Sequence, residues 1–268
     1  MVRQGKKKER TVDDMIKVAA EIAGGAAGAT VGFFTAGPAG AALGGGTGPL
    51  LAYTFMRLGA EMGRRLLAPR EELRIGATFA FAADRIRQKL ANGEQIRQDS
   101  FFQKQPDERA AADEVLEATL LVAQREHQER KLPFYGNLIA NIAFHPEIDR
   151  AQGNLLIRLA QRISYRQICL LALFGSPDKQ SFALREKDYR NVGSVGIARI
   201  GLLQEVYDLY SRGMLNASGE ALLGLGDVTP NKMNVQGTGA MLYNLMELWR
   251  IDTMGQDISE IVKLLREG

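Results

Sequence analysis

The chain has little of the chemistry that disulfide, metal or hydrolytic sites require. Its one cysteine, Cys169, excludes an intramolecular disulfide and favours a reducing compartment. The two histidines, His127 and His145, lie far apart, with no cysteine or carboxylate at ligand spacing. The glycine cluster 44–48 lacks the lysine that a phosphate-binding loop needs. We therefore expect no catalytic residue, no metal and no cofactor.

A second absence is local: no charged side chain occurs between Ile22 and Met56. This stretch carries a small residue at every fourth position. The positions are Gly24, Gly28, Gly32, Ala36, Gly40, Gly44 and Gly48. Because a helix repeats every 3.6 residues, this spacing lays the small residues along one groove, where a second helix can approach closely. We expect these positions to form a membrane or oligomer interface.

The high glycine content of this stretch indicates whether a soluble core or a membrane surrounds it. Each interior glycine costs about 1 kcal/mol relative to alanine in a helix, and glycine and alanine bury too little area to offset that in a soluble core. In a membrane, every backbone group must form an internal hydrogen bond, and close packing supplies the association energy. The stretch therefore favours a membrane, although packing inside a soluble assembly stays open as an alternative.

The segment from Ala23 to about Phe55 resembles the glycine-zipper segments of small membrane-inserting and pore-associated proteins. Gly37-Pro38 interrupts a continuous helix. We therefore predict a helical hairpin with arms Ile22–Gly37 and Ala39–Met56, which are roughly 24 and 27 Å long against about 30 Å of hydrocarbon. Such arms insert only marginally through their hydrophobicity alone.

Basic residues flank this stretch on both sides. Residues 1–21 form a basic arm and an amphipathic lead-in, and Lys6, Lys7, Lys8 and Arg10 are candidates for contact with anionic lipid headgroups, although a solvated arm stays open. Residues 56–91 predict amphipathic helices interrupted at Pro69. Their arginines predict either a solvated face or an anchor at a cytoplasmic membrane surface. These arginines are Arg57, Arg64, Arg65, Arg70, Arg74, Arg85 and Arg87.

We expect the chain to divide into the arm 1–21, the hairpin and its following helices 22–91, a polar linker 92–106 and a helical body 107–268. In the body we predict helices over 107–132, 134–144 and 154–161. Ser164 begins a capping box that leads into a further helix ended by Gly175. The fold class is mainly α.

Residues 155–250 resemble a winged-helix domain in their order of elements. A helix over 197–210 precedes short apolar pieces around Gly224 and Gly226, and a last helix opens at Thr238 and runs through Trp249. A small β-hairpin near the C-terminus is therefore expected. The resemblance implies a nucleic-acid-binding or protein-interaction module.

Arg158, Arg162 and Arg166, spaced four apart, are the candidate contacts to nucleic acid in this part of the chain. Glu205 and Asp208 on the predicted 197–210 helix would repel phosphates, so nucleic acid is not the expected partner. A solvated helix face is the alternative for the arginines.

The 268-residue chain, 46% hydrophobic and with net charge +3, fits a membrane-associated, non-enzymatic protein. We expect its hairpin to insert in or perforate a membrane on oligomerisation, as in a bacterial phage-defence or toxin-like effector. The expected partners are further copies of the chain, a phospholipid membrane and a protein sensor. The expected location is the cytoplasm, on or in the inner membrane. The alternative is a winged-helix-type regulator with a membrane or oligomerisation arm.

Overall fold

The computed structural model describes residues 48–63, 65 and 67–266, which are mainly helical as expected. The small antiparallel strand pair near the C-terminus is also confirmed, because β1 (Leu215–Asn216) pairs with β2 (Asn234–Val235). The predicted hairpin lies outside the described residues except for residues 48–56. The basic arm lies wholly outside them.

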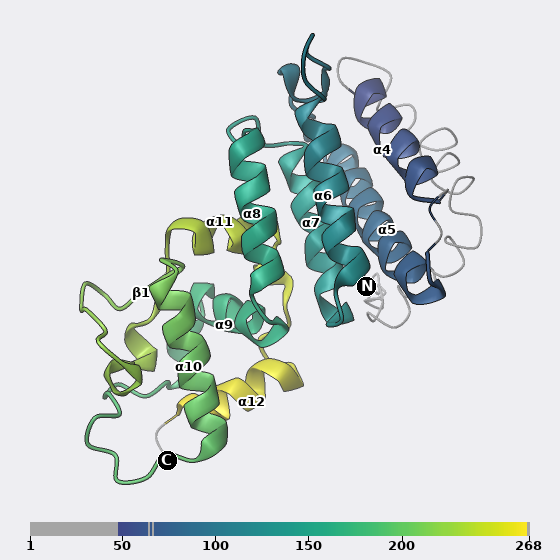
Figure 1. Cartoon of the computed structure of the whole chain (residues 1–268). Helices are drawn as coiled ribbons and strands as arrows, with labels where there is room; N and C mark the ends of the chain where they lie inside the picture. Colours follow the sequence, from purple (N-terminus) through teal and green to yellow (C-terminus); the bar gives the residue numbers. More distant parts are fainter. Residues whose placement is uncertain (1–47, 64, 66, 267–268) are drawn as a thin grey trace, which may run out of the picture. The chain divides into compact units, whose positions relative to one another are not determined.

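Two compact units make up the described chain, one ending at Ile157 and the other beginning at Arg158. The helix α8 (Arg150–Arg162) contains this division. The first unit also holds α4 (Gly48–Gly63), α5 (Pro69–Ala91), η1 (Ser100–Phe102), α6 (Ala111–Arg125), η2 (Glu129–Lys131) and α7 (Leu132–Ile142). Figure 1 labels the α-helices of this unit.

The pairing of α5 with α7 is the most extensive helix contact of the first unit. Pro69 occupies the first position of α5, where it fits the helical backbone, and Gly93, with a φ of +82°, follows the end of the helix. Gly136 of α7 lies directly against α5. A β-carbon there would lie 2.5 Å from Phe81 Cβ and 2.9 Å from the backbone nitrogen of Ala82. The two backbones therefore meet without an intervening side chain.

The segment 92–106, predicted as a linker, lies within the first unit. Ile96, Phe101 and Phe102 are buried, and so is Arg97. The Arg97 guanidinium donates to both carboxylate oxygens of Asp99 and to the backbone oxygens of residues 142, 146 and 148. These bonds hold the segment against the end of α7, which its polar composition does not suggest.

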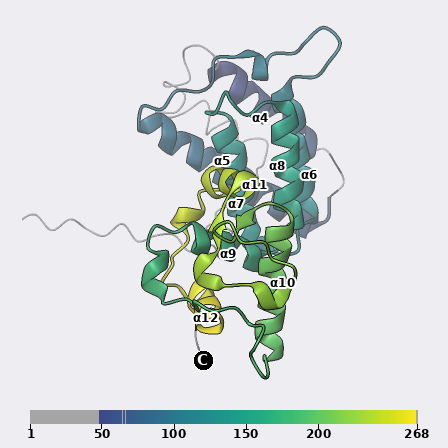
Figure 2. The same cartoon turned by 90° about the vertical axis from the view of Figure 1, so that its left-hand side faces the viewer.

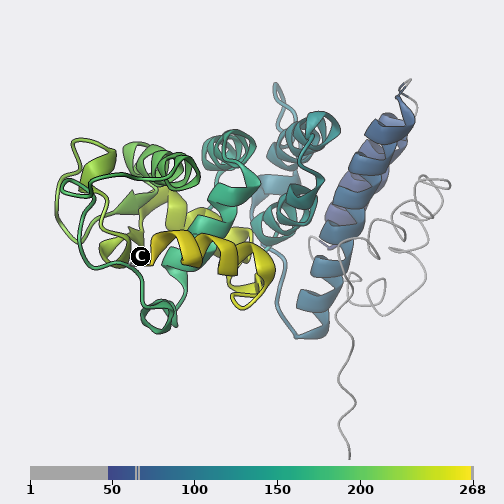
Figure 3. The ribbon, with the colours of Figure 1, turned by 90° about the horizontal axis from the view of Figure 1, so that it is seen from below.

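The second unit is built around α9 (Tyr165–Gly175), in which every residue from Gln167 to Phe174 is buried. Figure 2 shows α9 among its neighbours, and the C-terminal helix α12 (yellow in Figure 3) packs on α9 and α10. The neighbouring elements are η3 (Lys179–Phe182), α10 (Ile197–Ser211), η4 (Leu225–Asp227), η5 (Pro230–Lys232), α11 (Gly237–Leu245), η6 (Leu248–Arg250) and α12 (Gln256–Leu265).

Several predicted boundaries of the body match the structure and others shift. The Ser164 capping box is confirmed, since Ser164 Oγ accepts from the Gln167 amide at 3.0 Å and Gln167 Oε1 accepts from the Ser164 amide at 2.9 Å. α10 follows the predicted 197–210 helix closely. The helix predicted over 107–132 is shorter, because α6 ends at Arg125. The last predicted helix ends at Leu245, near Glu247, which adopts a left-handed φ of +58°.

We predict that Gly136→Ala destabilises the protein by about 1–3 kcal/mol, because the added methyl group forces α5 and α7 apart. Urea denaturation measures the loss. Gly193→Ala is the matched control, since no atom lies within 4 Å of a β-carbon at that position, and its effect should stay within about 0.5 kcal/mol. Equal stability of the two variants would show that α5 and α7 can move apart to accommodate the methyl group without loss of free energy of unfolding.

Candidate functional site

The predicted interface glycines Gly24 to Gly44 and the predicted lipid contacts Lys6 to Arg10 lie outside the described residues. Gly48, the last position of the four-residue pattern, is the first residue of α4. The candidate site is therefore the point where the charge-free stretch joins the first unit, and it consists of α4 and the surface that α4 covers.

An apolar stripe on α4 is buried in the first unit. Leu51, Phe55, Leu58 and Met62 recur at helical spacing, and each is at most 2% exposed. The ring of Phe55 packs edge-on against Phe79 of α5, with 5.8 Å between ring centroids. Full burial of such side chains contributes about 1.5–3 kcal/mol each. The C-terminal part of the second predicted hairpin arm is thus bound to protein.

On the side that faces away from this buried stripe, the first half of α4 also lacks charge. Residues 48–56 contain no charged side chain, and Leu50 and Tyr53 are exposed, Tyr53 to 59%. A soluble surface helix normally carries polar residues on the side that faces away from the core. The first half of α4 lacks such a side.

Ion pairs fasten the charged half of α4 to α6. Arg57 Nη2 lies 2.5 Å from Asp113 Oδ1, and Arg65 Nη2 lies 2.9 Å from Glu117 Oε1. Arg109 approaches the other oxygen of Glu117 at 2.7 Å. The hydrogen bonds from Arg109 and Arg65 lower the pKa of Glu117 below its usual range. The acidic face of α6 therefore holds Arg57 of α4 and Arg65, which follows the end of α4.

The arginines of α5 also find partners within the first unit. Arg70 and Arg74 both bind Glu129, and Arg74 donates to the backbone oxygen of Gln124. Arg87 pairs with Asp84 on the same helix. Each of these three arginines thus has a carboxylate partner within the first unit, although the side chains of Arg70 and Arg87 remain largely exposed.

A buried polar cluster lies between α6 and α7, at a place that the sequence did not indicate. Glu126 follows the last residue of α6 and is 7% exposed, while Lys131 is 2% exposed and Tyr135 is fully buried. Lys131 Nζ lies 2.6 Å from Glu126 Oε2, and the Tyr135 hydroxyl donates to the same oxygen at 2.7 Å. The helix thus ends before its predicted end at residue 132, because Glu126, directly after α6, adopts an extended backbone conformation.

The electrostatics of this cluster favour a structural role. Burial opposes ionisation of Glu126, but the hydrogen bonds from Lys131, Tyr135 and the Gln128 amide outweigh it and lower the pKa of the carboxyl. Burial and the nearby carboxylate raise the pKa of Tyr135. His127 is exposed, and its Nδ1 lies 3.7 Å from Glu126 Oε1, beyond hydrogen-bonding distance. No proton transfer between these two residues is indicated.

The predicted nucleic-acid contacts all lie in the second unit. Arg158 and Arg162 are exposed on α8, and neither side chain forms an ion pair with another described residue. Arg166 is also exposed, near the start of α9, but its Nε donates to Glu205 Oε2 of α10 at 2.8 Å. The structure therefore leaves two of the three arginines available to an anionic partner and pairs the third.

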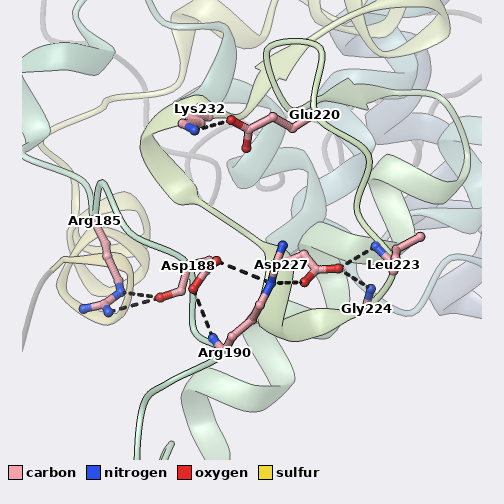
Figure 4. Close-up of polar contacts among 8 residues, drawn as sticks. All are labelled: Arg185, Asp188, Arg190, Glu220, Leu223, Gly224, Asp227 and Lys232. Atoms are coloured by element: carbon pink, nitrogen blue, oxygen red, sulfur yellow. Dashed lines mark hydrogen bonds and ion pairs between the residues drawn. The ribbon is translucent and has the colours of Figure 1, made fainter.

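A second polar cluster holds the long connection between β1 and β2 (Figure 4). Asp227 accepts hydrogen bonds from the amides of Leu223 and Gly224, at 2.6 and 3.0 Å, and from Arg190 Nε at 2.6 Å. The hydrogen bond from the Leu223 amide, followed by that from Arg190, lowers the pKa of Asp227. These contacts fix a tight loop whose Leu223 side chain is 89% exposed. Leu222, Leu223 and Val228 thus lie in the connection and form no strand.

Among the described residues, no group of three or more His, Cys, Asp or Glu side chains is arranged to hold a metal ion. None of the helices in the described ranges combines the length and the hydropathy that crossing a bilayer would require.

We predict that Lys131→Met destabilises the protein by about 3–5 kcal/mol, because it leaves the buried Glu126 carboxylate without its cation. Adding Glu126→Gln should recover part of this loss. Lys232→Met breaks the exposed pair with Glu220 and serves as the control, with an expected cost below about 1 kcal/mol. Urea denaturation measures all three variants. A loss for Lys131→Met no larger than the control would contradict the assigned role.

Comparison with models of protein families, with curated proteins and with solved structures finds no match to this chain.

Proposed function

We propose that the protein is a membrane-associated, non-enzymatic effector whose charge-free N-terminal stretch inserts in a membrane and associates between copies of the chain. The observation that carries the proposal is the small residue at every fourth position from Gly24 to Gly48, within a stretch that has no charge. In lipid, such a groove permits close contact between helices, which drives their association.

The described residues support the proposal at the junction with this stretch. Residues 48–56 form a helix whose buried side is bound to the first unit and whose other side exposes Leu50 and Tyr53. An apolar surface adjoining a charge-free segment suits the edge of a membrane better than bulk water. The phage-defence or toxin-like role at the inner membrane belongs to this proposal.

Fractionation tests the membrane proposal directly. We expect the full chain to pellet with membranes and to resist extraction by carbonate at alkaline pH. Recovery of all the protein in the soluble fraction, under resting and activating conditions alike, would contradict it.

The packing argument gives a separate prediction. Gly28→Leu with Gly32→Leu fills the groove while it raises the apolarity of the segment, so membrane insertion should persist while cross-linked oligomers and liposome leakage are lost. Ala26→Leu with Thr30→Leu adds bulk at the same spacing on another face of the helix and should keep both activities. If the glycine double variant still forms oligomers and causes leakage, the four-residue pattern is not an interface.

A second candidate function is an interaction module in the second unit, with the N-terminal stretch as an anchor. The exposed Leu223, presented on the loop that Asp227 fixes, favours a protein partner. On α10, Glu205 and Asp208 oppose contact with phosphates, and Arg199 donates to the backbone oxygen of Leu264. Nucleic acid is therefore the less favoured partner of this module.

Titration of duplex DNA with the full chain separates these partners. We expect no salt-sensitive binding at physiological ionic strength. If binding does occur through Arg158 and Arg162, then replacing either with alanine should reduce the slope of log K against log salt concentration by about one. Tight binding that behaves in this way would make the nucleic-acid regulator the leading function.

A further inference from the structure

Three observations converge on α4. Its first nine residues, 48–56, are also the last nine residues of the charge-free stretch. None of them carries a charge, and of those whose side chains the structure describes, Leu50 and Tyr53 are exposed while Leu51 and Phe55 are buried. A helix without a charged side is typical of a segment that is either fully buried or placed in lipid. In the described structure they are neither, because one side is buried in protein and the other side is exposed.

The packing of α4 on the first unit shortens the part of the charge-free stretch that could enter a membrane. The arm Ala39–Met56 measures about 27 Å as a helix, close to the thickness of the hydrocarbon layer. While α4 stays docked, only Ala39–Thr47 remains of that arm, and nine helical residues measure about 14 Å. The docked chain therefore cannot present a second arm that reaches across the layer.

We infer that α4 is an intramolecular lock, in which docking on α6 withholds residues 48–56 from the membrane and release of α4 completes the second arm. This inference rests on the proposed membrane function. The contacts that would have to break are the buried stripe headed by Leu51 and Phe55 and the ion pairs of Arg57 and Arg65 with α6. Lipid can replace the first kind of contact and anionic headgroups the second.

A covalent link between α4 and α6 tests the lock in the full chain. Because the side chains of Arg57 and Asp113 meet at 2.5 Å, a variant with Arg57→Cys and Asp113→Cys should be joined by a short bis-maleimide. The native Cys169 is buried and should not compete. A control variant with Arg74→Cys and Glu129→Cys is joined in the same way, because that pair meets at 3.1 Å and does not involve α4.

Vesicles of phosphatidylethanolamine and phosphatidylglycerol, loaded with a dye, report the outcome. Linking α4 to α6 should lower the leakage rate by about tenfold or more relative to the same variant before linking, as expected if a minor released state is the active one. Linking the control pair should leave leakage unchanged. As a second measurement, the yield of the 57–113 link should fall when the reagent is added after the protein has bound vesicles.

The outcomes separate the two proposals. Equal leakage by linked and unlinked protein, or an equal yield of the 57–113 link on vesicles and in solution, would overturn the lock and leave the membrane function standing. Vesicle binding and leakage that are absent from the unmodified chain as well would overturn the membrane function and the lock with it.

Discussion

At Gly136, α7 approaches α5 until only glycine fits, with the Thr78 carbonyl oxygen 3.0 Å from where a β-carbon would lie. This contact fixes the two helices of the first unit that share the largest interface, and α6 and then α4 pack outward from them. Ala140 of α7 follows Gly136 at a spacing of four and is fully buried. A small residue at Gly136 thus permits this close approach between helices that carry ordinary charged faces. The N-terminal stretch is distinguished by its lack of charge.

Charge pairing gives the first unit its outer layer. The arginines that follow the charge-free stretch, on α4, just after it and on α5, are bound by carboxylates of α6, η2 and their own helices. Each such pair is partly exposed and contributes little alone. The pairs of Arg57 and Arg65 orient α4 on α6, while the buried apolar stripe supplies most of the stabilisation. In this layer the arginines therefore set the orientation of α4, and its buried Leu, Phe and Met side chains supply the free energy of packing.

The sequence predicts well those features that depend on local signals. The Ser164 capping box, the start of α5 at Pro69 and the extent of α10 all follow from residues within one or two turns. The early end of α6 could not be predicted in this way, because it depends on Glu126 meeting Lys131 and Tyr135 after the chain has turned. The helix α12, which was not predicted, does carry a local signal in the spacing of Ile258, Ile261, Val262 and Leu265.

The candidate site was predicted only in part, for a similar reason. Composition identifies a charge-free stretch, but no local signal in residues 48–56 indicates that α6 covers one side of the helix that they form. The segment 92–106 shows the same limit. Its polar sequence indicates a linker, and only the folded chain brings Arg97 to the end of α7.

The bonding of Arg97 also determines which residue that position can hold. Its five N–H groups meet five acceptors, two on Asp99 and three backbone oxygens from the end of α7 and the turn that follows. Lysine has three donors on one tetrahedral nitrogen and cannot reach acceptors arranged around a plane. Arginine at this position therefore joins the polar segment 92–106 to the end of α7 through a geometry that lysine cannot reproduce.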